Sequence, residues 1–120
     1  MKIEIKLNTG AIQRLEAAAK AAAVDAMEQL HTDLVSSQTM PFDNGDMQNN
    51  QTFVDTTESG AVLITGSPQA RRLYYHPEFN FQRGKNANAG AHWLEPYISG
   101  SKKDFIREKY TELFRRRAGL

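Results

Sequence analysis

The sequence predicts an α+β fold, in which a small antiparallel β-sheet packs against a long N-terminal helix and a C-terminal helix. Two apolar stripes with helical spacing flank a pair of short strand-like segments. A long irregular aromatic arm, residues 71–97, lies between these segments and the second helix. A chain of 120 residues is expected to form a single domain, residues 1–120.

A strand is predicted at residues 2–7, because three apolar side chains there alternate with charged ones. Asn8 and Thr9 follow as candidate N-caps of a long helix over residues 10–36. Apolar side chains recur along this helix at spacings of three and four, so they form one stripe, and its alanines let another backbone approach closely. The stripe consists of Ile12, Leu15, Ala19, Ala22, Ala26, Leu30 and Leu34.

A β-hairpin is predicted at residues 52–66, where two strand-like runs flank a turn at residues 58–60. The second run is the more apolar, which predicts that it is the more buried strand. A second helix is predicted at residues 101–117, with Ser101 as its N-cap. Three arginines at the C-terminal end of this helix complement the helix dipole.

The two halves of the chain carry opposite net charges. Residues 1–60 hold four Lys/Arg against nine Asp/Glu, a net charge of −5, whereas residues 61–120 hold eleven against five, a net charge of +6. Such a chain can stack on copies of itself or present a basic face to nucleic acid. The alternative is that folding neutralises the asymmetry by internal ion pairs.

The sequence argues against most catalytic chemistry. The chain has no Cys, which excludes disulfides, thiolate metal sites and Cys nucleophiles, and it has no nucleophile elbow, P-loop or dinucleotide-binding motif. His76, Glu78, His92 and Glu95 could form a metal site, but their spacing gives no reason for the two pairs to converge. We therefore predict no catalytic residue, no metal, no cofactor and no enzymatic activity. Since no apolar run approaches about 20 residues, no membrane span is expected.

The candidate functional residues lie in the arm, where basic and aromatic side chains are interleaved. Contact with another protein subunit is favoured for most of them, whereas for Trp93 a core position between helix and sheet is favoured. The same side chains could stack on bases and neutralise phosphates. Dedicated nucleic-acid-binding domains usually have a pI above about 9, against a pI of ≈ 8.0 for this sequence. The candidates are Arg71, Arg72, Tyr74, Tyr75, Glu78, Phe79, Phe81, Arg83, Lys85 and Trp93.

The order of motifs along the chain resembles that of the minor capsid and head–tail joining (neck) proteins of tailed phages. That family has a strand, a long Ala-rich helix, a P-x-D-T-G-x-L loop, a hairpin, a Tyr-Ala…Glu-x-Gly segment and a P-F-L-x-P-A box before the last helix. The corresponding loop, segment and box here are residues 41–47, 74–80 and 92–97. Asn44 stands where the family has Thr, Tyr75 where it has Ala and Asn80 where it has Gly.

This resemblance implies a non-enzymatic structural protein of the virion, made in the cytoplasm of the bacterial host and placed at the head–tail junction. It implies a ring of identical subunits whose other partners are portal or connector proteins and tail proteins. A basic lumen or rim of the ring would contact passing DNA without sequence preference. The alternative from another class is a small nucleic-acid-binding module that uses the basic and aromatic residues of the arm.

Overall fold

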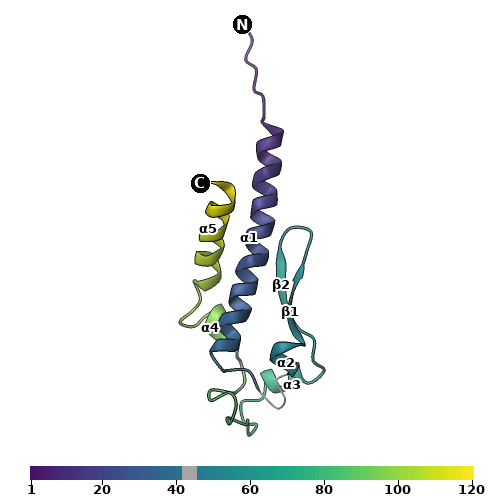
Figure 1. Ribbon diagram of the computed structural model, residues 1–120, viewed down its shortest axis with the longest axis vertical. Coiled ribbons are helices and arrows are strands. Elements are labelled where there is room, and N and C mark those ends of the chain that lie inside the picture. Colours follow the sequence, from purple (N-terminus) through teal and green to yellow (C-terminus); the bar gives the residue numbers. More distant parts are fainter. Residues whose placement is uncertain (42–45) are drawn as a thin grey trace.

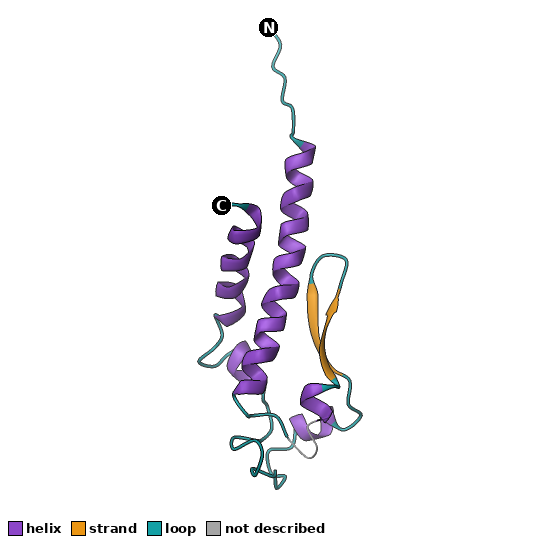
Figure 2. Ribbon diagram, viewed as in Figure 1, coloured by secondary structure: helices purple, strands orange, loops and turns teal. Residues whose placement is uncertain are grey.

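The computed structural model describes residues 1–41 and 46–120, and one long helix organises the rest (Figure 1). The elements are α1 (Thr9–Ser36), α2 (Asp46–Asn49), β1 (Thr52–Thr56), β2 (Ala61–Thr65), α3 (Ala70–Tyr74), α4 (Glu95–Ile98) and α5 (Phe105–Ala118). Figure 2 shows three layers, with α1 in the middle, α5 antiparallel to it on one side and the β1–β2 hairpin on the other. This arrangement confirms the predicted α+β class.

The molecule is elongated. Its extents are 75 × 26 × 22 Å and its radius of gyration is 18.9 Å, whereas a compact chain of this length has a radius of gyration of about 14 Å. The first turns of α1 and the residues before it extend past the ends of α5 and of the hairpin (Figure 1). Among the described residues, no second layer of the same subunit therefore covers this end of the molecule.

Helix α1 begins where the sequence predicts, because the side chain of Asn8 accepts a hydrogen bond from the backbone N–H of Ala11 (3.0 Å). The predicted apolar stripe is buried from Ala22 onward. Its first two members, Ile12 and Leu15, are instead 40% and 42% exposed, because α5 and the hairpin end short of the first turns of the helix (Figure 1). The buried residues of α1 are Ala18, Ala22, Ala26, Leu30 and Leu34.

The prediction of a strand at residues 2–7 is wrong, since residues 1–8 lie in no helix or strand. The tip of the hairpin lies beside the middle of α1, where a Cβ on Gly60 would be 3.9 Å from the Cβ of Ala23. Asn8 is about 22 Å further along the axis, at 1.5 Å per residue. Eight extended residues span at most about 29 Å, so while α1 is intact residues 2–7 reach at most the first residue pairs of their own hairpin and cannot pair along its strands.

The predicted hairpin is present, and within the described residues its two strands form the whole sheet. The strands pair antiparallel, with Thr52 opposite Thr65 and Thr56 opposite Ala61. Since side chains alternate between the faces of a strand, Thr52 and Leu63 share the inner face, where Thr52 is buried and Leu63 packs on the core. The opposite, outer face carries Phe53, Asp55, Val62 and Ile64.

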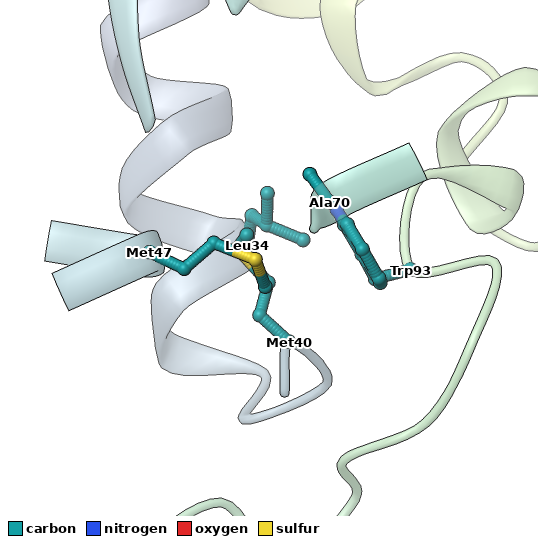
Figure 3. Close-up of a cluster of buried hydrophobic side chains, with 5 residues drawn as sticks. All are labelled: Leu34, Met40, Met47, Ala70 and Trp93. Atoms are coloured by element: carbon teal, nitrogen blue, oxygen red, sulfur yellow. The ribbon is translucent and has the colours of Figure 1, made fainter. Parts of the chain in front are cut away.

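Two apolar clusters hold the layers together. The first closes the C-terminal end of α1 and joins it to α2, α3 and the arm; its buried members are Leu34, Met40, Met47, Ala70 and Trp93 (Figure 3). The second lies between α1 and α5, where the small side chains of α1 let the other helix approach closely. Its buried members are Ala22, Ala26 and Leu113, flanked by the half-buried Ile106, Tyr110 and Phe114.

Helix α5 begins four residues later than the predicted helix at 101–117, and Ser101 is not its cap. Asp104 precedes the helix and makes no side-chain capping hydrogen bond. The residues before it form a tight turn against α4, in which a Cβ on Gly100 would lie 2.7 Å from the Cα of Pro96. Only glycine fits this approach, so the turn uses the residues that the capping pattern assigned to the first turn of the helix.

A cluster of three polar side chains fastens the junction of α4 and α5 to the end of α1. The carboxylate of Asp33 accepts hydrogen bonds from the Tyr97 hydroxyl (2.5 Å) and the Lys102 ammonium (2.8 Å). Burial alone would raise the pKa of Asp33, but the hydrogen bonds from Lys102 and Tyr97 outweigh it and hold that pKa below its usual value. Burial, together with the hydrogen bond to Asp33, raises the pKa of Tyr97.

Replacing the carboxylate of this cluster should destabilise the protein in a pH-dependent way. Asp33→Asn should lower the free energy of unfolding at pH 7 by about 1 kcal/mol, because the pair is only partly buried. Since the folded-state pKa of Asp33 is lowered, its contribution is present above the unfolded-state pKa of about 3.9 and is lost as pH falls through the folded-state pKa. Urea denaturation should therefore show wild type and variant converging at pH 2. Asp104→Asn, in an exposed pair with Arg107, is the control and should change little at either pH; an undiminished difference at pH 2 would contradict the assignment.

Truncating the tryptophan of the first cluster should be far more damaging than truncating an exposed aromatic residue. Trp93→Ala should lower the free energy of unfolding by about 3–5 kcal/mol, because it opens a cavity in the main core. Trp93→Phe should cost less, since the indole Nε1 is buried without an acceptor among the described residues and no hydrogen bond is lost. Tyr75→Ala, at a side chain 62% exposed, should stay within about 0.5 kcal/mol of wild type. Equal losses for Trp93→Ala and Tyr75→Ala in urea denaturation would show that Trp93 is not part of the core.

Candidate subunit-interface surface

The arm, residues 71–97, wraps around the C-terminal end of α1 and is held there by backbone hydrogen bonds. It begins in α3 and ends in α4, and residues 75–94 between these helices lie outside helices and strands. The backbone N–H of Asn88 donates to the carbonyl of Gln38 (3.1 Å), and that of Gly90 donates to the carbonyl of Thr39 (3.1 Å). These bonds fix the middle of the arm against the segment that follows α1.

A buried amide reinforces this attachment. The side-chain nitrogen of Asn86 donates to the carbonyl of Met40 (2.8 Å) and to Oε1 of Gln48 (2.8 Å). The carbonyl of Gln48 in turn accepts from Nε2 of His31 (3.0 Å), so the chain of contacts extends from the arm through α2 to α1. Sequence reasoning missed these positions, because an Asn or Gln in a polar stretch carries no mark that distinguishes a buried amide from an exposed one.

Aromatic rings gather around Tyr74 at the end of α3. Its ring contacts those of Tyr75, His92 and Trp93 edge to face, with centroid distances of 5.1, 5.2 and 4.8 Å. Burial, and secondly the charge of Glu95, raises the pKa of the Tyr74 hydroxyl, so this hydroxyl stays protonated. The aromatic group is thus continuous from the buried Trp93 to the exposed Tyr75.

A second, exposed group lies just beyond Tyr75. The imidazole of His76 stacks on the ring of Phe79 at a centroid distance of 4.7 Å, and the guanidinium of Arg72 lies 5.9 Å from the centroid of the same ring. His76 is also 2.7 Å from a carboxylate oxygen of Glu78, and this hydrogen bond lowers the pKa of Glu78. These four residues, Arg72, His76, Glu78 and Phe79, form an outer edge of the arm that combines charged and aromatic side chains.

An open groove of about 470 Å³ lies between β2, α3 and α4. Its lining is mainly aromatic and aliphatic, and Arg71 is the one charged member among the described residues that line it. Ile98 and Tyr75 line it while remaining 67% and 62% exposed, so two large apolar side chains here lack a covering partner. The lining residues are Leu63, Thr65, Ala70, Arg71, Tyr74, Tyr75, Trp93, Leu94 and Ile98.

The described residues do not neutralise the positive charge of the arm. Among the described residues, Arg71, Arg72, Arg83 and Lys85 make no ion pair. Arg83 donates instead from Nε to the carbonyl of Ala89 (3.3 Å). These four exposed cations therefore remain available to a carboxylate of another subunit or to a phosphate.

Internal pairing neutralises only part of the charge difference between the two halves. Within the described residues, two ion pairs join the acidic half to the basic half: Asp33 with Lys102, and Asp25 with Arg117. Three further cations of α5 pair within their own helical segment, where Arg107 lies near Asp104 and both Lys109 and Arg116 lie near Glu112. Most of the asymmetry predicted from the sequence is therefore still present on the folded surface.

The structure brings together part of the predicted set of site residues. Four of them, Arg71, Tyr74, Tyr75 and Trp93, line the groove. Arg72, Glu78 and Phe79 form the adjoining edge described above, whereas Phe81, Arg83 and Lys85 line neither surface. Sequence reasoning missed the other lining residues, of which only the apolar Ile98 before a Ser-Gly turn offered a local signal; they are Leu63, Thr65, Ala70, Leu94 and Ile98.

The described residues offer no site for a metal and no membrane span. Within residues 1–41 and 46–120, no three His, Asp or Glu side chains are grouped closely enough to hold an ion. None of the helices in the same residues combines the length and the apolar character that crossing a bilayer requires. The loop that resembles the P-x-D-T-G-x-L motif, residues 41–47, lies mostly outside the described residues.

No protein-family model, no curated protein and no solved structure matches this chain. The resemblance to head–tail joining proteins therefore rests on the order of its sequence motifs, and the groove and its cations are the features of this chain that bear on what it contacts.

Proposed function

We propose that this chain is a structural protein of a tailed-phage virion, which assembles with copies of itself into a ring at the portal–tail junction. In this proposal the groove and the outer edge of the arm contact a neighbouring subunit, and portal and tail proteins bind the two rims of the ring. No step of the proposal requires catalysis or a cofactor.

The observation that carries the proposal is the open, apolar groove with its exposed rim. Large exposed side chains such as Tyr75 and Ile98 are typical anchors of a protein interface, where an aromatic or aliphatic group fills a pocket of the partner. The groove is open, and its described lining residues include no His, Asp, Glu, Ser or Lys that could serve as a nucleophile or as a general base near neutral pH. A protein surface suits this shape better than a small substrate does.

The shape and the charge of the subunit support assembly with its own copies. An elongated chain with uncovered apolar residues along α1 gains burial from neighbours that it cannot obtain alone. The unpaired cations of the arm complement the acidic first half of a second copy, which gives a contact between unlike surfaces. Contacts between unlike surfaces close into rings when the rotation between subunits permits it.

A nucleic-acid-binding module is the second candidate, and the unpaired cations of the arm favour it. Arg72 lies next to the exposed ring of Phe79, and Arg71 lies next to Tyr75 in the groove. Cations beside exposed rings can neutralise phosphates and stack on bases. The ring proposal accommodates weak contact of this kind with DNA that passes through the lumen.

Placing a charge at the rim of the groove should weaken self-association without unfolding the subunit. Tyr75→Asp should raise the concentration needed for assembly about tenfold or more, because it puts an unpaired carboxylate where an anchor is buried. Native mass spectrometry and negative-stain imaging measure the assembly, and circular dichroism checks the fold. Thr111→Asp, which puts the same group on the exposed face of α5, is the matched control. Wild type that remains at 13.5 kDa at every concentration, with steep salt-dependent DNA binding, would refute the ring.

Removing two arm cations distinguishes a DNA-binding module from a ring subunit. If the arm binds duplex DNA directly, Arg71→Ala/Arg72→Ala should reduce the slope of log K against log salt by about 2, since each phosphate contact contributes about 0.9. Arg107→Ala/Arg116→Ala, which removes cations already paired on α5, should reduce it less. Fluorescence anisotropy at several salt concentrations provides the measurement. For a ring subunit we expect weak wild-type binding and a small change from either double variant.

A further inference from the structure

Residues 2–7 have the pattern of a β-strand but no strand to pair with. Ile3, Ile5 and Leu7 alternate with charged residues and are 85%, 84% and 73% exposed. Three large aliphatic side chains at such exposure, all on one face of an extended segment, are a substantial apolar surface without a partner. The segment extends beyond α1, away from the rest of the subunit (Figure 1).

The hairpin, in turn, has two strand edges to which no third strand is paired in the described residues. Within the described residues β1 pairs only with β2, so the outer edge of each strand presents backbone N–H and C=O groups that no further strand satisfies. Two-stranded sheets are marginally stable, and a third strand is the usual remedy. On the outer face of the hairpin, Phe53 and Val62 are 44% and 40% exposed and lie beside the half-buried Ile64.

The two surfaces match in length and chemistry. Six extended residues span about 20 Å, and each five-residue strand of the hairpin spans about 17 Å. If residues 2–7 lie along one edge of the hairpin with their aliphatic face outward, they continue the apolar surface of Phe53, Val62 and Ile64. Aliphatic and aromatic side chains on neighbouring strands are favourable cross-strand pairs.

The partner cannot be the hairpin of the same chain. As shown above, about 22 Å of α1 separates Asn8 from the level of the hairpin tip, so eight extended residues reach only its first residue pairs. Full pairing within one chain would require the first turns of α1 to unfold, although Asn8 caps that helix. A second copy of the chain has no such restriction, and it carries the same open hairpin.

We propose that residues 2–7 of one subunit add as a third β-strand to the β1–β2 sheet of a second copy of this chain. The proposal rests on the self-assembly in the proposed function and names a contact that the groove does not provide. Each subunit then donates a strand to one neighbour and accepts a strand from the other. Strand addition of this kind takes its affinity from backbone hydrogen bonds and its register from the alternating side chains.

Disulfide trapping between two variants tests the contact directly, because the chain has no Cys of its own. A chain with Ile5→Cys is mixed with a mass-tagged chain that carries either Phe53→Cys or Val62→Cys, so that one probe lies on each strand of the hairpin. Neighbouring strands bring facing Cβ atoms to about 4.5–5.5 Å, close enough for a disulfide after a small adjustment. We expect the mixed dimer from at least one pair, in at least tenfold excess over the controls.

Two controls make the test specific for a paired strand. Glu4→Cys lies next to Ile5 but on the opposite face of an extended segment, so it should cross-link poorly to the same hairpin positions. Glu108→Cys, on the exposed surface of α5, reports random collision with Ile5→Cys. Equal yields from Glu4→Cys and Ile5→Cys, or from α5 and the hairpin, would overturn the proposal.

A second variant separates this contact from the assembly as a whole. Ile3→Asp/Ile5→Asp should raise the concentration needed for assembly at least tenfold, with an unchanged circular dichroism spectrum, since these residues lie outside the folded elements. Lys2→Asp/Lys6→Asp changes the charged face of the same segment and should have a smaller effect. Wild-type rings without hairpin cross-links would overturn strand addition and leave the ring in place. A wild-type monomer without cross-links would overturn both.

Discussion

The closure of the C-terminal end of α1 by the cluster around Trp93 is the contact on which the other parts of the structure depend. The cluster draws one buried side chain each from α1, the segment after it, α2, α3 and the arm. Because the hairpin follows directly on α2, the same contact also places the strands against α1. A hairpin of two strands is too small to be stable alone, so its position depends on this core.

Hydrogen bonds around the cluster fix the orientation in which the arm and α4 pack against the end of α1. Apolar burial is non-directional, whereas a hydrogen bond fixes both distance and angle. On one side Asn86 ties the arm to Met40 and Gln48, and on the other Asp33 binds Tyr97 and Lys102. Most of the arm therefore has no regular secondary structure but is held in place by these hydrogen bonds. Its exposed rings and cations lie on a defined surface.

The sequence predicts the elements that are determined by neighbouring residues along the chain. It fails for elements that depend on contacts between residues far apart in the sequence. The apolar stripe of α1, the cap at Asn8 and the hairpin all follow from spacing and turn residues, and all are present. The pattern at residues 2–7 is that of a strand, but a strand needs a partner, and the length of α1 removes the one in its own chain. The start of α5 is decided by the approach of Gly100 to α4, which no capping pattern contains.

For the candidate surface, the sequence predicts the aromatic and basic character of the arm. It does not predict which of these side chains are buried or which residues from other elements lie beside them. The aromatic and basic character of the arm is evident from composition, yet the buried Trp93 and the exposed Tyr75 carry the same signal. The groove also needs Leu63 from β2 and Ile98 from α4, which are brought to the arm only by tertiary packing. Asn86 and Asn88 look alike in sequence, although one is buried and the other is exposed.

The uneven covering of α1 has a consequence for how the helix opens. Its first turns carry the exposed Ile12 and Leu15, its middle packs small alanine side chains against α5, and its C-terminal end lies in the main core. Backbone amides along this single helix must therefore exchange with solvent through different openings, from fraying at Thr9 to global unfolding near Leu34. Local stability thus increases along this one helix from Thr9 to Leu34. A neighbouring subunit that covers the N-terminal turns would reduce the difference in stability between the two ends.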